Sequence, residues 1–379
     1  MDHTPSVALQ LTRFYVQKIF VPIVVTVGIL GNICNIVVLS HPRMTSSTNV
    51  YLTILAACDM LYLVFSLTLG FVFCSYRDMP ESSFQYIPYG RVLSDIFGNT
   101  AVWLTVAFTI ERYIGVCHPM KGKIWCTVTR ARWIVLHTFL ICLTITFPEF
   151  FEMEIAEVRD VSANTTYYIC RGTELSESHS YQIGYYWFYV TFFTLLPLLL
   201  LAIFNSFLIK SVWEAIRIRR ELQNSSSRRD NRTHQEQHRI TIMLITVVIM
   251  FMLSQLPWTI LLLYKAFLSA NDIPANSDGL RIAGNITNLL GQVNASCNFL
   301  LYSYFSTRFR KTFQKLVCSW NENFIKSPRL GTRNPSHVLT STVRGNREDT
   351  ACDETLIPLK SCSWQNGYHG NGVKSAPKG

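Results

Sequence analysis

Four polar side chains stand inside stretches that are otherwise apolar, where each would need a partner. They are Asn32, Asp59, Asn294 and Asn298. An ionisable group at membrane depth is costly to bury and marks a functional site by default. Asn294 and Asn298 are four residues apart and therefore share one helix face. We expect the four to form a buried polar cluster around Asp59. The alternative is a helix–helix hydrogen-bond network without a switching role.

The elements that position these residues are seven long apolar runs. They are Ile19–Ser40, Val50–Cys74, Val92–Cys117, Trp133–Phe151, Tyr185–Ile209, Ile240–Leu268 and Leu280–Phe305. A bilayer core about 30 Å thick requires ~20 apolar residues in a helix. Helices satisfy their backbone hydrogen bonds internally, so the sequence predicts an all-α membrane protein with a seven-transmembrane helix bundle. The first run is longer than the apolar region of a signal peptide and is expected to remain as a span.

The charge pattern predicts the orientation. Of the 379 residues, 49% are apolar and only 15% charged, with a net charge of +10. Eight Lys and Arg lie in Lys210–Arg239 and twelve follow Phe305, whereas Glu152–Tyr181 has two against six acids. Cytoplasmic loops carry the excess of Lys and Arg, so the N-terminus is expected outside a plasma membrane. This topology accounts for the basic balance, and no nucleic-acid partner is expected.

The remaining segments also follow from the pattern. Residues 1–18 are expected to be an extracellular N-terminus, 19–305 the bundle, 306–318 an amphipathic eighth helix on lipid, and 319–379 a disordered cytoplasmic tail. The expected modifications are palmitoylation of Cys318, a disulfide between Cys74 and Cys170, and glycosylation of Asn164. An unmodified Cys318 and free outer thiols stay open as alternatives.

Several motifs occur in an order typical of one family. They are Gly31-Asn32, Leu55-Ala56-Ala57-Cys58-Asp59, Glu111-Arg112-Tyr113, Pro197, Pro257 and Asn298…Tyr302. In these residues the chain resembles the rhodopsin-like (class A) G-protein-coupled receptors. Residues 105–119, together with Asn298-Phe299-Leu300-Leu301-Tyr302, resemble the FMRFamide-receptor branch of neuropeptide receptors. Neighbouring branches, such as thyrotropin-releasing-hormone-like receptors, remain open.

The chain departs from the class pattern at several positions. Glu111 stands in place of Asp, Phe299 in place of Pro, and Asn205 in place of Tyr. The segment before Pro257 lacks the usual Trp, so Gln255 could contact ligand or water instead. Ile87 stands where the class has a cysteine, which leaves Cys74 as the alternative partner of Cys170.

The resemblance implies a two-state bundle with a switch at its inner end and a ligand pocket at its outer end. The implied switch residues are Glu111, Arg112, Tyr113, Asn205, Asn298 and Tyr302. Arg112 would pair with Glu111 at rest and turn to a heterotrimeric G protein when active. The candidate ligand-binding residues are Asp95, Asn99, Tyr189, Gln255, Trp258, Asn288 and Gln292. For the neighbouring Tyr185–Trp187, an interfacial aromatic belt is the competing interpretation.

The charge of the outer side indicates the ligand. Six acids in Glu152–Tyr181, with Asp95 beneath them, attract cations. Together with the resemblance, this predicts a short cationic peptide with an amidated Arg-Phe end. The rivals are a seven-helix transporter or ion pump and a receptor for a non-peptide ligand. No metal-ligand cluster, paired catalytic carboxylates or cofactor motif occurs in the sequence, so no enzyme activity or cofactor is expected, and the last apolar run has no Lys for a retinal Schiff base.

Overall fold

The computed structural model describes residues 6–74, 81–160, 165–222, 246, 249–265, 267–268 and 277–325. The chain divides into two units, Met1–Lys326 and Ser327–Gly379, and every described residue belongs to the first. The expected glycosylation site Asn164 and all but the first seven residues of the expected tail lie outside the described residues.

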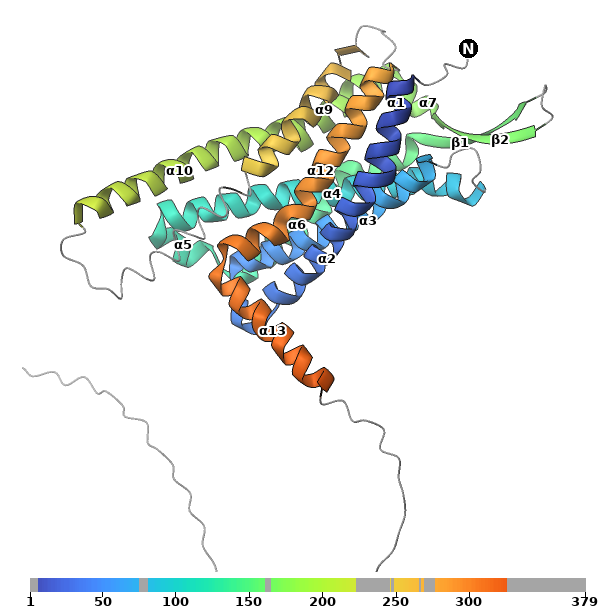
Figure 1. Cartoon of the computed structure of the whole chain (residues 1–379). Helices are drawn as coiled ribbons and strands as arrows, with labels where there is room; N and C mark the ends of the chain where they lie inside the picture. The colour runs from blue at the N-terminus through green and yellow to red at the C-terminus, as the bar shows by residue number, and fades with distance from the viewer. Residues whose placement is uncertain are drawn as a thin grey trace, which may run out of the picture. The chain divides into compact units, whose positions relative to one another are not determined.

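The described residues are predominantly helical (Figure 1). Their elements before the hairpin are α1 Val7–Thr12, η1 Arg13–Phe20, α2 Val21–Leu39, η2 Pro42–Met44, α3 Ser47–Cys74, α4 Glu81–Cys117, α5 Pro119–Trp125, α6 Val128–Thr146 and η3 Phe147–Phe151. After the hairpin follow α7 Glu174–Glu177, α8 His179–Tyr181, η4 Gln182–Tyr186, α9 Trp187–Val190, η5 Thr191–Leu195, α10 Leu196–Leu222, the helix Ile249–Lys265, α12 Asp278–Phe305 and α13 Thr307–Ile325.

Five helical stretches are long and apolar enough to cross a membrane among the residues described. They are Val7–Leu39, Ser47–Phe71, Phe84–Cys117, Val128–Phe151 and His179–Ser211. The sixth expected span is described in part, as the shorter apolar helix Ile249–Lys265. The seventh corresponds to α12, which has 28 residues and carries several Asn and Gln side chains.

The outer faces of these helices fit a lipid environment. On α2 a stripe of large apolar side chains is exposed at helical spacing, formed by Ile23, Val27, Leu30, Ile33 and Val37. An apolar surface of this kind is unfavourable in water and favourable against acyl chains. The predicted helical membrane fold is confirmed.

The first span starts twelve residues earlier than predicted, at Val7 instead of Ile19. The Ser6 side chain caps α1 by accepting a hydrogen bond from the Leu9 backbone N–H. The Ser6 backbone N–H donates to Asp278 Oδ2 at the start of α12, at 2.7 Å, and Leu9 is fully buried. Hydropathy alone did not predict these first helical turns. They are joined to α12 by a hydrogen bond between Ser6 and Asp278, which lie 272 residues apart in sequence.

A β-hairpin interrupts the helices in the loop where the sequence placed six acids. Strands β1 (Met153–Asp160) and β2 (Thr165–Gly172) pair antiparallel, with Ile155 opposite Cys170. Glu154 and Arg171 face each other across the strands, 2.6 Å apart. The hairpin contacts α4, so the helical bundle carries a small sheet that the sequence analysis did not predict.

The helices pack most closely where glycines allow it. α12 lies alongside α2 (Figure 1), and a Cβ atom on Gly28 would stand 2.2 Å from Ser296 Oγ. A Cβ atom on Gly31 would stand 2.9 Å from Phe299 Cβ. Small residues at a membrane helix interface permit this close backbone approach.

Candidate functional site

Four charged side chains meet at the N-terminal half of α4, the half that the predicted topology places outside. Arg91 and Asp95 are one turn apart on α4, Glu149 lies on η3, and Glu152 follows η3 directly; we call these four residues the outer acidic cluster. Arg91 forms an ion pair with Glu152, and its Nη2 lies 3.9 Å from Glu149 Oε2. Asp95 interacts electrostatically with both Arg91 and Glu149. Contact between the two carboxyl groups is unfavourable when both are charged.

The cluster contains more negative than positive charge. Three carboxyl groups face one guanidinium, and the Glu149 side chain is only 6% exposed. No hydrogen bond from a described residue reaches Glu149 Oε2. A buried acceptor without a donor costs about 1–3 kcal/mol. The cluster would therefore be stabilised by an additional cationic donor.

Two other predicted ligand residues lie next to this cluster. Asn99 Nδ2 donates to Tyr189 Oη at 2.7 Å, and the Tyr189 hydroxyl interacts in turn with Glu149. The structure thus brings Asp95, Asn99 and Tyr189 into one polar group, which Arg91 and Glu149 complete. The sequence analysis missed Arg91 and Glu149, although Arg91, Asp95 and Asn99 are spaced four residues apart on one helix face.

The aromatic residues of the fifth span divide between two environments. Tyr185 Oη donates to the Ile145 carbonyl at 2.8 Å, and Tyr181 Oη donates to Glu152 Oε1 at 3.0 Å. The two rings stack with centroids 4.8 Å apart. By contrast, Trp187 and Phe188 are exposed. The belt interpretation fits Trp187, whereas Tyr185 takes part in a specific contact with α6.

The other predicted ligand residues lie apart from the outer acidic cluster. Gln292 is buried and donates to Ser66 Oγ. Trp258 packs against the cluster of Leu261, Leu268 and Leu280. Gln255 is half-buried and Asn288 exposed, and among the described residues no hydrogen bond joins either to Asp95.

At the opposite end of α4, the Glu111 carboxylate is held by α3 as well as by its neighbour. Glu111 Oε1 accepts hydrogen bonds from Ser47 Oγ at 2.8 Å, Thr48 Oγ1 at 3.2 Å and Arg112 Nη2 at 3.0 Å. Glu111 itself is buried. The predicted contact of Arg112 with Glu111 is present, its role in a resting state stays a prediction, and the hydroxyls of Ser47 and Thr48 are partners that the sequence analysis missed.

Three further predicted switch residues lie near this end. Tyr302 and Asn205 are buried, and Tyr302 Oη and Asn205 Oδ1 accept or donate no hydrogen bond among the described residues. Asn205 Nδ2 donates to the Leu201 carbonyl within its own helix. The Tyr113 ring packs against Phe204 and Phe207 of α10. Their role in a switch stays a prediction.

The predicted buried polar cluster is only partly assembled. Asn298 Nδ2 donates to Asp59 Oδ2 at 2.7 Å. Asn32 instead donates to the Ala295 carbonyl at 2.9 Å, which links α2 to α12. No hydrogen bond joins the Asn294 side chain to Asp59 within the described part of the chain. Of the three amides, only Asn298 has a hydrogen bond to Asp59 among the described residues, and a single cluster of all four side chains stays a prediction.

Phe299, which stands where the class has proline, connects two helices. Its ring lies 6.0 Å from that of Phe309 and 5.9 Å from that of Phe313, both on α13. In the fifth span, the π-helical turn Thr191–Leu195 directly precedes Pro197, whose missing N–H disturbs the regular ladder. The fifth span is thus irregular near Pro197. In α12, Phe299 stands where the class has proline, and its ring packs against α13.

The predicted modification sites are described in part. Cys170 is a free thiol in the structure, and the Cys74 side chain lies outside the described residues, so their disulfide stays a prediction. Cys318 is exposed on α13. Its acylation, and the position of α13 on a lipid surface, also stay predictions.

Comparison with known proteins decides the family. Residues 31–302 match the family model described as 7 transmembrane receptor (rhodopsin family). The chain belongs to this family. The receptor is 30% identical to an FMRFamide receptor of Drosophila melanogaster over 323 residues, which are 82% of this chain and 55% of that protein. It is 27% identical to the sex peptide receptor of the same organism, over 89% of this chain and 78% of that protein.

A vertebrate relative lies at similar distance. The receptor is 26% identical to the human thyrotropin-releasing hormone receptor, over 86% of this chain and 83% of that protein. The chain spans about half the length of the FMRFamide receptor that it matches, 55%. These relatives are receptors and not enzymes, and the family match does not favour a transporter or ion pump.

Proposed function

We propose that this protein is a plasma-membrane receptor with an extracellular N-terminus that binds a cationic, amidated Arg-Phe-type neuropeptide and activates a heterotrimeric G protein. The observation that supports this proposal is the charge of the outer acidic cluster. Three carboxyl groups surround one guanidinium, and Glu149 Oε2 has no hydrogen-bond donor among the described residues. The similarity to an FMRFamide receptor points to the same ligand class.

The cluster suits a guanidinium better than other groups. An arginine of the ligand could donate to Asp95 and Glu149 at once, which would relieve the repulsion between the two carboxyl groups. Each charge-assisted hydrogen bond contributes about 1.5–3 kcal/mol. An amidated terminus is favoured because a free carboxylate would be repelled by the same three acids.

One helix carries both ends of the proposed path. Arg112 follows Asp95 by 17 residues on α4, which is ~25 Å at 1.5 Å per residue. Ligand contact favours an active state only if the ligand binds that state more tightly. We infer that the active state releases Arg112 from Glu111, so that it can contact the G protein together with Tyr302 and Asn205.

The test combines matched peptides with matched variants. Cells expressing the full chain would be screened for second-messenger responses to an amidated Arg-Phe peptide, its free acid and its Arg-to-norleucine analogue. Asp95→Asn and Glu149→Gln should each weaken the Arg peptide by about 10-fold to 100-fold, from the value of a charge-assisted hydrogen bond. Both should weaken the norleucine analogue much less. Glu154→Gln, which removes an exposed hairpin acid, is the control for overall charge.

Two results would contradict the proposal. A double-mutant cycle without coupling between the peptide arginine and either carboxyl group would remove the outer acidic cluster from the site. Activation by an acidic peptide or a neutral lipid, with no response to amidated Arg-Phe peptides, would overturn the ligand class. In membranes, loss of high agonist affinity on addition of guanine nucleotide would support G-protein coupling.

A further inference from the structure

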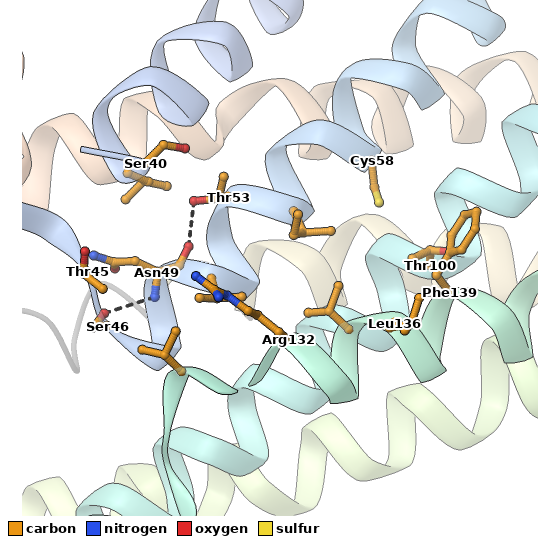
Figure 2. Close-up of a pocket in the computed structure, with 15 residues that line it drawn as sticks. Ser40, Thr45, Ser46, Asn49, Thr53, Cys58, Thr100, Arg132, Leu136 and Phe139 are labelled. Carbon is orange, nitrogen blue, oxygen red and sulfur yellow. Dashed lines mark hydrogen bonds between the residues drawn. The ribbon is translucent and has the colours of Figure 1, made fainter. Parts of the chain in front are cut away.

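A groove on the side of the bundle plays no part in the proposed ligand site or switch. It has a volume of about 540 Å³ and is formed by the end of α2, the first turns of α3, α6, and Thr100 of α4. Figure 2 shows its lining, with Ser46 and Asn49 toward one side, Cys58 and Phe139 toward the other, and Arg132 between them. The two ends of the groove therefore differ in polarity.

The polar end has one uncommitted charged donor. Three of the neutral groups there already have partners: Thr45 Oγ1 donates to Pro42 O, Asn49 Nδ2 donates to Met44 O, and Ser46 Oγ accepts from Asn49 N. Arg132 is exposed, and none of the ion pairs found in the described part of the chain involves it. No described Asp or Glu lines the groove.

The other end is suited to hydrocarbon. Ile54, Leu136 and Phe139 line it, and the two hydroxyls there are satisfied within their own helices. Thr53 Oγ1 donates to Asn49 O at 2.7 Å, and Thr100 Oγ1 donates to Ile96 O at 2.7 Å. From Val50 to Cys58 the lining runs along two turns of α3, or about 12 Å.

The groove opens on a surface that faces lipid. Trp133, Leu136 and Leu140 on α6 are each about half exposed, at 58%, 45% and 47%. In a bilayer these side chains contact acyl chains. Arg132 lies at the same end of the bundle as the loop cations Arg43, Lys121 and Lys123, which the positive-inside pattern assigns to the cytoplasmic leaflet.

We propose that this groove binds one anionic glycerophospholipid of the cytoplasmic leaflet, with its headgroup at Arg132 and an acyl chain along Val50–Cys58. The polarity of the groove matches that of the lipid: a charged headgroup continuous with a hydrocarbon chain. A sterol would supply a neutral hydroxyl and leave Arg132 without a counter-charge. The cytoplasmic leaflet is rich in anionic lipid, which attracts cations near the membrane surface. This proposal is independent of the identity of the peptide ligand.

The test uses the purified full-length receptor in detergent and native mass spectrometry of its lipid adducts. Phosphatidylserine, phosphatidylcholine and cholesterol would be titrated separately. We expect phosphatidylserine to bind about fivefold more tightly than phosphatidylcholine, as a single cation near the lipid surface predicts. Arg132→Gln should abolish that preference. Arg130→Gln removes the same charge two residues away, from a side chain that contacts Trp125 and does not line the groove, and should retain it.

A second variant tests the apolar end. Leu136→Trp fills the groove from an exposed position and should reduce the binding of both phospholipids while leaving the melting temperature unchanged. An unaltered phosphatidylserine preference in Arg132→Gln, or an equal loss in Arg130→Gln, would overturn the proposal. So would cholesterol binding that exceeds phosphatidylserine binding and is lost in Leu136→Trp.

Discussion

Replacing Gly28 by alanine tests the close contact between α2 and α12. The added Cβ would stand 2.2 Å from Ser296 Oγ, 2.8 Å from Ser296 Cβ and 2.7 Å from Leu63 Cδ1. Carbon atoms pack best at about 3.5–4.0 Å, so α2 and α12 must separate by roughly 1 Å or Ser296 must move. Ser296 Oγ lies within hydrogen-bond distance of the Val24 and Gln292 carbonyls, at 3.1 and 2.7 Å, and either adjustment disturbs these bonds.

The magnitude follows from two opposing effects. Overpacking a well-packed contact costs about 1–3 kcal/mol, and the disturbed interhelical hydrogen bond adds roughly 0.6 kcal/mol. Alanine is a better helix former than glycine by about 1 kcal/mol, which offsets part of this cost. We expect a net loss of about 0.6–2.6 kcal/mol, which lowers the melting temperature by about 2–4 °C per kcal/mol.

Gly284→Ala is the matched control. It lies in α12, and a Cβ there would meet nothing within 4 Å, so only the gain in helix propensity remains. Thermal unfolding of both variants in detergent can be followed with a thiol-reactive dye, because Cys58 and Cys142 are buried until the bundle opens. Gly28→Ala should melt below the wild type and Gly284→Ala at or above it.

Removal of the opposing side chain should rescue the variant. Ser296→Gly deletes the two atoms at 2.2 and 2.8 Å and leaves only the flexible end of Leu63 in contact with the new methyl group. Ser296→Gly carries its own cost, since it removes the Ser296 hydrogen bonds and places a glycine in a helix, so it is the reference for the double variant. Adding Gly28→Ala to Ser296→Gly should therefore lower the melting temperature much less than adding it to the wild type. Equal melting of Gly28→Ala and Gly284→Ala, or an equal effect of Gly28→Ala in both backgrounds, would refute the packing argument.

Three other predictions concern separate parts of the receptor. Arg112→Ala should abolish G-protein nucleotide exchange and leave peptide binding measurable, and normal signalling from this variant would remove Arg112 from the switch. Non-reduced peptide mapping should find Cys74 linked to Cys170, and serine at either position should impair surface expression equally. Any unpaired Cys170 should react slowly with maleimide at neutral pH and faster as pH rises, because burial raises the pKa of its thiol and lowers the thiolate fraction. Phe299→Ala should increase hydrogen exchange in α13, since each aromatic pair contributes about 0.5–1.5 kcal/mol; Leu300→Ala, at an exposed neighbour, should not.

The spans could be predicted from the sequence because hydrophobic length is a local property. Every residue of an apolar run contributes to its own transfer into lipid, whatever the rest of the chain does. The start of the first span could not be predicted in this way. The helix from Val7 is accompanied by the Ser6–Asp278 hydrogen bond, and this pairing has no counterpart in local hydropathy.

Site residues could be predicted from the sequence where few side chains could serve as their hydrogen-bond partners. Asp59 needs a partner at membrane depth, which limits the choice to a few amides, and Asn298 is the one that contacts it. Arg91 was missed because it precedes the predicted third span, which begins at Val92. Glu149 was missed because it is a single acid near the end of a long apolar run, where its neighbours outweigh it in any hydropathy window.

The hairpin could not be foreseen for a different reason. Half of the eight residues of β1 are charged, a composition that is unusual for a strand, and β1 forms only as the antiparallel partner of β2. Strand formation here depends on pairing between residues such as Glu154 and Arg171, which a single-strand pattern does not specify.

The aromatic contact of Phe299 with α13 has a mechanical consequence. A proline at this position would let the inner segment of α12 bend independently, whereas here the ring is wedged against Phe309 and Phe313. These contacts tie α13 to the end of α12, so a rotation of α12, as the proposed switch requires, should move α13 with it. Cys318, exposed on that helix, is a native attachment point for a spin label or fluorophore that would detect such a movement when agonist is added.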